Sequence, residues 1–312
     1  MILLATNKRD VTTDFVVQEM RRRDVAFFRL NTEDIGDFQI EMIDGNPATM
    51  RLTRASEALD LCKITAAYYR RPGRPEFAET DEEIVSYLTA EWSAVLRSMW
   101  NSLDGRWLNS PFSILRAEDK PRQLKLARQA GLSVPATLVS NIFSALQKFS
   151  SSGSTVVKPL RHALIEKGDG GSVVFTSRLA GLEETDLEAV NRAPIIAQTE
   201  VRKRCDVRVI VVDDNLFATA IGSQDHEETK TDWRRGVRTD LSHDSIKLPK
   251  DVELSCISVV KFLGLRFAAI DLVEDLEGQY WFLEANPNGQ WAWIEQKTAA
   301  PISAAIVDGL TR

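Results

Sequence analysis

The residues best suited to chemistry lie in one stretch, residues 267–289, which reads Phe-Ala-Ala-Ile-Asp-Leu-Val-Glu-Asp-Leu-Glu-Gly-Gln-Tyr-Trp-Phe-Leu-Glu-Ala-Asn-Pro-Asn-Gly. Two apolar runs flank Glu277-Gly278, and this pattern predicts a β-hairpin with a two-residue turn. In that register Asp271 faces Glu284 on the neighbouring strand, and Asn286 lies on the same face two residues beyond. The sequence therefore places two carboxylates and an amide on one side of the hairpin.

The remaining positions of this hairpin have simpler predicted roles. Val273 should face Phe282 on the side that carries the carboxylates. The opposite side should pack in the core, and the acids next to the turn should be solvated. These residues are Ile270, Leu272, Trp281 and Leu283 for the core, and Asp275 and Glu277 for the turn.

Two carboxylates that face each other on adjacent strands repel, so such a pair needs a cation nearby. Oxygen ligands supplemented by an amide suit Mg²⁺ shared with phosphates better than they suit zinc. We therefore predict that Asp271, Glu284 and Asn286 bind Mg²⁺. The alternative is a solvated acidic hairpin in another register, because a slip of one residue exchanges the two faces.

A magnesium site that shares phosphates also needs cationic side chains. Lys120 begins a predicted helix, and Lys158 ends the strand 155–158, where Pro159 stops the ladder and leaves the ammonium free to reach a ligand. Either lysine can also be an ordinary surface residue. The glycine-rich stretch 168–171 offers backbone amides to phosphates, but it matches neither the P-loop nor the G-x-G-x-x-G spacing.

Two further segments have the pattern of a nucleotide site. Residues 195–201, Ile-Ile-Ala-Gln-Thr-Glu-Val, pass from a buried strand into a polar stretch, as expected of a hinge that offers backbone amides to adenine. In the next strand Asp206 and Arg208 alternate on one face. That pair suits either ribose and phosphate or an ion pair across a sheet edge.

The elements that must position these residues follow an alternating strand and helix pattern. Strand 2–5, helix 11–23 and strand 25–30 predict a βαβ unit and a partly parallel sheet. A hairpin (38–43 and 48–52), a strand (64–69) and a long helix (81–102) follow. Asn109-Ser110-Pro111 supplies a cap and a proline for a new helix, so we place the first domain boundary there. Beyond it we predict strands at 136–139, 155–158, 172–176, 195–199, 207–212 and 216–222, and a helix at 252–263.

Composition excludes several classes of protein. The chain has 312 residues, and 39 basic against 45 acidic side chains give a net charge of −6, without the basic patch of a nucleic-acid binder. Three scattered cysteines exclude a disulfide framework and a thiolate zinc site, and they suit a reducing cytoplasm. No apolar run approaches the length of a membrane span. We expect a cytoplasmic α/β protein, with α+β character, that binds neither nucleic acid nor membranes.

From Lys120 onward these elements, in this order, resemble the ATP-grasp ligases. Within that superfamily, Tyr68-Tyr-Arg-Arg-Pro72 and the segment 286–295, Asn-Pro-Asn-Gly-Gln-Trp-Ala-Trp-Ile-Glu, look like the graspetide (microviridin-type) peptide-maturing ligases. The ribosomal-protein glutamate ligases are similar more distantly. The resemblance implies an ATP-grasp fold in three parts: a pre-ATP-grasp domain (1–110), a central subdomain (111–198) and a C-terminal subdomain (199–312).

The resemblance also implies cofactors and partners. ATP and Mg²⁺ would bind between the last two parts, and the partner would be a precursor peptide with a leader and an acidic core; a homodimer is included among the expected assemblies. Roles then follow for individual residues. Lys120 and Lys158 would contact phosphates, Gln198, Glu200, Val201 and Asp206 would bind the rest of the nucleotide, and Arg208 with Arg234 or Arg235, preferably Arg234, would contact the acyl phosphate.

The implied reaction phosphorylates an Asp or Glu side chain of the peptide, and a Ser/Thr hydroxyl or a Lys amine then attacks the acyl phosphate to form an ester or an amide. Arg70 and Arg71 are candidates for the substrate carboxylate, although a charged loop is an equal reading. His162 is a candidate base, residues 177–191 are candidates for leader contacts, and Trp291 and Trp293 should pack in the interior. The alternatives are a ligase for a free amino acid or small amine, and a nucleotide-binding module without catalysis.

Overall fold

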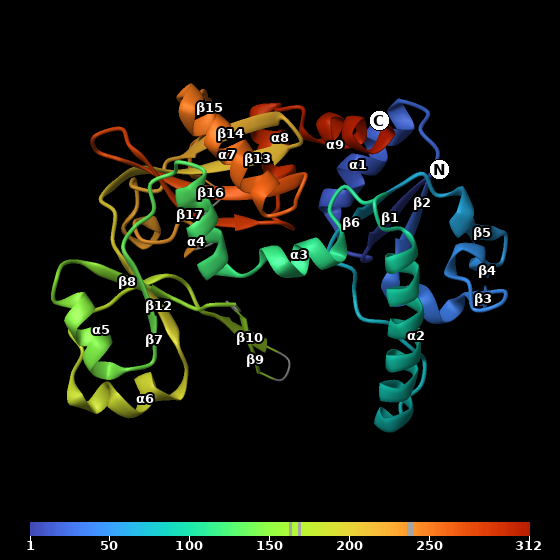
Figure 1. Cartoon of the computed structure of the whole chain (residues 1–312), viewed down its shortest axis with the longest axis horizontal. Helices are drawn as coiled ribbons and strands as arrows, with labels where there is room; N and C mark the ends of the chain where they lie inside the picture. The colour runs from blue at the N-terminus through green and yellow to red at the C-terminus, as the bar shows by residue number, and fades with distance from the viewer. Residues whose placement is uncertain (162–163, 168–169, 236–239) are drawn as a thin grey trace. The chain divides into compact units, whose positions relative to one another are not determined.

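The computed structural model describes residues 1–161, 164–167, 170–235 and 240–312, and these fall into two compact units. The first unit contains Met1–Leu115, Gly264–Ala268 and Pro287–Arg312, and the second contains Arg116–Leu263 and Ala269–Asn286. Figure 1 shows the elements of both. The three-part division at residues 110 and 198 stays a prediction.

The first unit is built on the predicted βαβ motif. Strands β1 (Ile2–Thr6), β2 (Phe27–Asn31) and β6 (Ala66–Tyr69) form a parallel sheet in the order β2-β1-β6. Helix α1 (Val11–Arg22) connects the first two strands and begins at Asp10, whose side chain accepts a hydrogen bond from the Thr12 N–H. Helix α9 (Ile302–Thr311) packs against both α1 and β6.

A small antiparallel sheet and a long helix complete this unit. β3 (Gln39–Glu41) and β4 (Arg51–Arg54) pair as the predicted hairpin, whereas β5 (Glu57–Asp60) was not predicted. Residues Pro47–Thr49 form a 3₁₀ turn instead of the predicted strand, because the Asn46 side chain accepts from the Ala48 N–H. Helix α2 (Glu82–Ser102) was predicted to within a residue and begins after Asp81, which caps two of its N–H groups.

The second unit contains two larger sheets. In the first, β11 (Ser177–Arg178), β8 (Thr155–Lys158), β12 (Ile195–Thr199) and β7 (Thr137–Ser140) form an antiparallel sheet in that order, and α5 (Phe143–Ser150) packs on it. α6 (Leu187–Arg192) contacts α5. A separate pair, β9 (Leu164–Lys167) and β10 (Gly170–Val173), follows β8. Of the predicted glycine loop, Gly168 and Asp169 lie outside the described residues.

The second sheet of this unit carries the predicted carboxylates. Its order is β15 (His243–Ile246), β14 (Asn215–Ile221), β13 (Lys203–Val212), β16 (Phe267–Asp275) and β17 (Tyr280–Asn286). α4 (Lys120–Gln129) packs on β17, and α7 (Lys250–Phe262) packs on β13 and α4. The remaining helices are α3 (Pro111–Ala117) and α8 (Ala292–Thr298), and the other 3₁₀ turns are Thr32–Asp37, Leu61–Lys63, Glu184–Asp186 and Glu227–Thr229.

The carboxylate hairpin, β16 and β17, has the predicted register at one end and a different one at the other. Asp271 pairs with Glu284, as predicted. Val273 pairs with Trp281, not with Phe282, because the turn has three residues and ends at Gly278 with φ 86°. An irregularity between Asp271 and Leu272 then offsets the extra residue.

Three side chains of this hairpin have surroundings that differ from the prediction. Trp281 and Leu283, predicted to be core residues, are only partly buried. Asp275 is buried, not solvated: it accepts hydrogen bonds from the Glu277 and Gln279 N–H groups, and the Trp281 indole N–H, which also donates to it, lowers the pKa of its carboxyl. Asp275 therefore closes the turn.

Candidate active site

A single pocket of the second unit gathers most of the predicted site residues. Their side chains or backbones come from β8, β12, β13, β16 and β17, from the start of α4, and from the segment after β14. The predicted residues that line it are Lys120, Lys158, Gln198, Glu200, Val201, Asp206, Arg234, Asp271 and Glu284.

The two carboxylates of the hairpin are flanked by arginines. Arg208 Nη1 lies 2.5 Å from Asp271 Oδ1, and Arg234 Nη2 lies 2.6 Å from Asp271 Oδ2. Because β13 is next to β16, the Arg208 interaction is a cross-strand pair at the centre of the sheet. Arg234 Nη2 also lies 3.5 Å from Glu284 Oε1, so it bridges both acids and their charge raises its pKa, Asp271 contributing most.

Two lysines approach the same acids from the other side. Lys120 Nζ lies 3.3 Å from Glu284 Oε2 and donates to the Pro159 carbonyl. Lys158 Nζ donates to the Leu283 carbonyl at 3.3 Å. Burial alone would raise the pKa of Glu284, but Lys120, Lys158 and Arg234 lower it to about 2. Burial lowers the pKa of Lys158 to about 8, against the opposing effect of Glu284.

The donor set at this site suits Mg²⁺. Only ionised carboxylates are good ligands for a hard cation, and the surrounding cations keep Glu284 ionised. Within the described residues there is no group of three or more His, Cys, Asp or Glu side chains that could hold a metal ion. A third protein ligand would therefore come from an amide such as Asn286, which ends β17 two residues beyond Glu284. The three ligands stay a prediction.

The predicted adenine hinge lines the pocket with side chains that are already engaged. Gln198 is buried and its amide donates to the Thr137 hydroxyl at 3.0 Å. The Glu200 carboxylate accepts from Arg178 at 2.8 Å and from the Ser154 hydroxyl at 2.6 Å. These contacts fix the strand end. The N–H groups of Thr199 and Glu200 are also bonded, to the carbonyls of Ala136 and Ser154, so recognition of adenine at this hinge stays a prediction.

Asp206 and Arg208 have different partners. Asp206 is bonded to Lys203 at 2.6 Å, both side chains are buried, and burial raises the pKa of Asp206 despite the nearby ammonium. Arg208 is paired with Asp271 instead. The structure therefore shows ion pairs, but on the central strand β13 and not across a sheet edge, and a role for Asp206 in nucleotide binding stays a prediction.

The neighbouring arginines after β14 are also separated by the structure. Arg234 lies in the pocket, 5.2 Å above the ring of Trp233, whereas Arg235 donates to the Thr176 carbonyl and the Ser177 hydroxyl. Trp233 and Lys203 are among the lining residues that sequence reasoning missed. The first stands in the noted Asp232-Trp-Arg segment, and its aromatic type beside an arginine was the available signal.

The other predicted site residues lie elsewhere. Arg70 and Arg71 belong to the first unit, where Arg70 is buried against Asp10. Their role with substrate stays a prediction, as do leader contacts at 177–191. Trp291 is fully buried and meets the Phe15 ring edge-on, which confirms its predicted packing role. His162 lies outside the described residues.

Comparison with known families covers nearly the whole chain. Residues 1–114 match the MvdD pre-ATP grasp domain, and residues 117–310 match the RimK-like ATP-grasp domain, which contains the entire pocket. The chain belongs to the RimK-like ATP-grasp family. It is thus an ATP-grasp ligase, with the fold expected from its sequence.

This ATP-grasp ligase is similar to solved peptide-modifying enzymes along its full length. The macrocyclase MdnC of Microcystis aeruginosa MRC, solved with its precursor peptide MdnA, is 28% identical, covers 100% of this chain and 99% of its own, and has a TM-score of 0.85. A RiPP-associated ATP-grasp ligase of Chryseobacterium gregarium, solved with ADP and a leader and core peptide, is 25% identical over 99% and 96% of the two chains, with a TM-score of 0.90.

A curated relative has a different name. The probable alpha-L-glutamate ligase of Histophilus somni (strain 2336) is 24% identical over 288 residues, 89% of this ATP-grasp ligase and 90% of the relative. Both expected resemblances, to peptide macrocyclases and to glutamate ligases, are therefore confirmed. No helix among the described residues is long and apolar enough to cross a membrane.

Proposed function

We propose that this ligase uses ATP to activate Asp or Glu side chains of a precursor peptide and joins them to Ser/Thr hydroxyls or Lys amines of the same peptide. The observation that carries the proposal is the pocket lined by Asp271, Glu284, Arg234 and two lysines, with Arg208 paired to Asp271. Full-length similarity to a macrocyclase that was solved with its precursor peptide supports a peptide as substrate.

The reaction has two steps. A carboxylate oxygen of the substrate attacks the γ-phosphorus of ATP, and the bond to the β-phosphate oxygen breaks to release ADP. A hydroxyl or amine then attacks the acyl carbon, phosphate leaves, and the proton of the nucleophile passes to a base or to solvent. The product is an ω-ester or an ω-amide.

The chain supplies charge and positioning to both steps. In this proposal Lys120 and Lys158 bind phosphate oxygens, and Arg208 and Arg234 stabilise charge on the acyl phosphate. Asp271, Glu284 and Asn286 would hold Mg²⁺, which supplies neutralising charge to the phosphates. We further propose that adenine binds against residues 198–201.

A second candidate function is ligation of a free amino acid or small amine to a carboxylate. The 24% identity to a probable alpha-L-glutamate ligase favours it. The two functions share the acyl-phosphate step and differ in which molecule supplies the nucleophile.

The proposed function predicts ATP turnover that depends on a peptide. We expect ADP release only when a leader-bearing peptide with acidic and Ser, Thr or Lys residues is present, and a product lighter than the peptide by one water per bond formed. Mass spectrometry and a coupled ADP assay measure these outcomes. ADP release with free glutamate and an amine, and none with any such peptide, would favour the second function.

Nucleotide binding should also take up a proton. In the free protein burial holds the pKa of Lys158 at about 8, so the ammonium is partly neutral above that pH. Phosphates that contact it would favour the charged form and raise its pKa. Calorimetry of ADP binding at pH 8.5 in buffers of different ionisation enthalpy should show uptake of up to about 0.75 proton, the fraction of a group with a pKa of about 8 that is neutral at that pH. The Lys158→Arg variant should show none, and equal uptake in both proteins would contradict the assignment.

A further inference from the structure

At the open end of the carboxylate hairpin, the buried side-chain amide of Asn109 bonds to both ends of the hairpin. Asn109 Oδ1 accepts from the N–H groups of Arg266 (2.9 Å) and Phe267 (3.1 Å), and Asn109 Nδ2 donates to the carbonyls of Phe267 (2.8 Å) and Pro287 (3.3 Å). Asn109 thus links the start of β16 to the first residue after β17. The cap of α3, which was predicted within Asn109-Ser110-Pro111, comes from Ser110.

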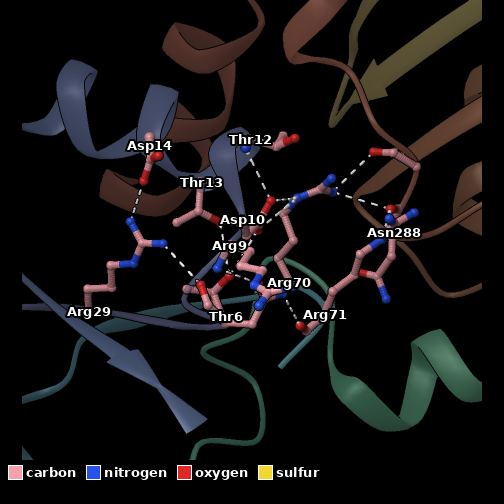
Figure 2. Close-up of polar contacts among 12 residues, drawn as sticks. Thr6, Arg9, Asp10, Thr12, Thr13, Asp14, Arg29, Arg70, Arg71 and Asn288 are labelled. Atoms are coloured by element: carbon pink, nitrogen blue, oxygen red, sulfur yellow. Dashed lines mark hydrogen bonds and ion pairs between the residues drawn. The ribbon is translucent and has the colours of Figure 1, made fainter. Parts of the chain in front are cut away.

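Two arginines at the end of β6 hold the next carbonyls of the same loop. Arg70 Nη1 donates to the carbonyls of Asn288 (3.3 Å) and Gly289 (3.1 Å), and Arg71 Nε donates to Asn288 (3.1 Å). Figure 2 shows both arginines directed at Asn288. Three successive carbonyls, 287 to 289, are therefore bound by side chains of the first unit.

Arg70 is itself fixed by a buried network. Its Nε lies 3.1 Å from Asp10 Oδ2, with the two side chains 1% and 6% exposed. Asp10 also accepts from the hydroxyls of Thr6 (2.9 Å) and Thr13 (2.6 Å), as Figure 2 shows. A turn of Arg70 toward a substrate carboxylate would remove the cation that pairs with the buried Asp10 carboxylate, which is unfavourable.

We propose that Arg70 is a positioning residue for the magnesium site. Arg70 and Asn109 hold the loop that begins at Pro287, so they fix the residue at which β17 ends. Asn286 is joined to Pro287 by a peptide bond, and its backbone position is therefore restricted too. Ligand supports of this kind set metal affinity because they orient the ligands. The inference rests on the proposed function, in which Asn286 and Glu284 bind Mg²⁺. It differs from the substrate-binding role expected from the sequence.

The Arg70→Lys variant tests this role. Lysine keeps a positive charge beside Asp10, but one ammonium cannot replace the planar fork that reaches two carbonyls. We expect the Mg²⁺ concentration that half-saturates ADP binding, measured by calorimetry, to rise about tenfold. ADP affinity without Mg²⁺ and the KM for the peptide should not change.

Arg29→Lys is the matched control. Arg29 lies in the middle of β2 in the same sheet, binds Asp14 of α1 and the Asn7 carbonyl, and is drawn in Figure 2 away from Asn288. We expect Arg29→Lys to leave the Mg²⁺ requirement unchanged. If Arg70→Lys raises the KM for the peptide and leaves the Mg²⁺ requirement as in the wild type, Arg70 contacts substrate and the proposal is wrong.

A second variant keeps the test valid if the Arg70→Lys protein does not fold. A thermal unfolding measurement would reveal that failure. Arg71 is exposed, so Arg71→Lys should fold, and it should shift the Mg²⁺ requirement in the same direction by a smaller factor. An unfolded Arg70→Lys together with an unaltered Arg71→Lys would overturn the inference. If the wild-type protein binds ADP without any Mg²⁺ dependence, the proposed metal site is wrong. The positioning role of Arg70 is then wrong as well.

Discussion

The Glu284→Gln variant is expected to lose ADP release almost completely, by at least about 100-fold. Glutamine keeps the size of the side chain and its hydrogen-bonding capacity, but it removes the charge that Lys120, Lys158 and Arg234 surround. A neutral amide is also a weaker ligand for Mg²⁺ than a carboxylate. The coupled ADP assay with peptide substrate measures the loss.

Glu274→Gln is the matched control for this change. Glu274 lies on β16 of the same hairpin, but it pairs with Arg204 at 3.2 Å and is absent from the pocket lining. It should retain wild-type turnover. The Glu284→Gln protein should still bind ADP without Mg²⁺, because the cations of the pocket remain. Unchanged turnover in Glu284→Gln would show that Glu284 is not a ligand of Mg²⁺.

The second large effect is expected at Arg234, whose neighbour provides the comparison. Arg234→Lys should lower kcat about 100-fold, because a lysine cannot contact Asp271 and Glu284 with a planar fork while it also binds an acyl phosphate. Arg235→Lys should have little effect on kcat, since Arg235 bonds to Thr176 and Ser177 instead. Steady-state kinetics of both variants measures these changes in kcat. A greater loss of kcat in Arg235→Lys than in Arg234→Lys would assign the acyl-phosphate contact to Arg235 instead.

The cross-strand pairing of Asp271 with Glu284 could be predicted from the sequence, although the predicted length of the turn was wrong. Alternation of apolar residues identified both strands, and a turn signal at Gly278 set the approximate register. The three-residue turn shifts the pairing register by one residue, and the irregularity between Asp271 and Leu272 shifts it back. Such irregularities depend on packing against neighbouring strands, so the alternation pattern alone does not contain them.

Buried polar side chains were the hardest to predict. Arg70, Asn109 and Asp275 each looked like surface or cap residues, because their types are mostly exposed in proteins. Each is buried here with all-protein partners, several of them far away in the sequence. Long-range partners of this kind follow from topology, which local spacing does not reveal. The nucleotide and catalytic residues came largely from resemblance to a family, which supplies that topology.

The first unit has a consequence for how the chain folds during synthesis. Its sheet begins at residue 2, but α9, which packs against α1 and β6, begins at residue 302, and the loop that Arg70 holds follows residue 286. Domains generally fold in the order in which the ribosome releases them. Here we expect the opposite order, because residues 116–263 and 269–286, which form the second unit, leave the ribosome before α9 of the first unit is made. The part of the protein made first is thus completed last.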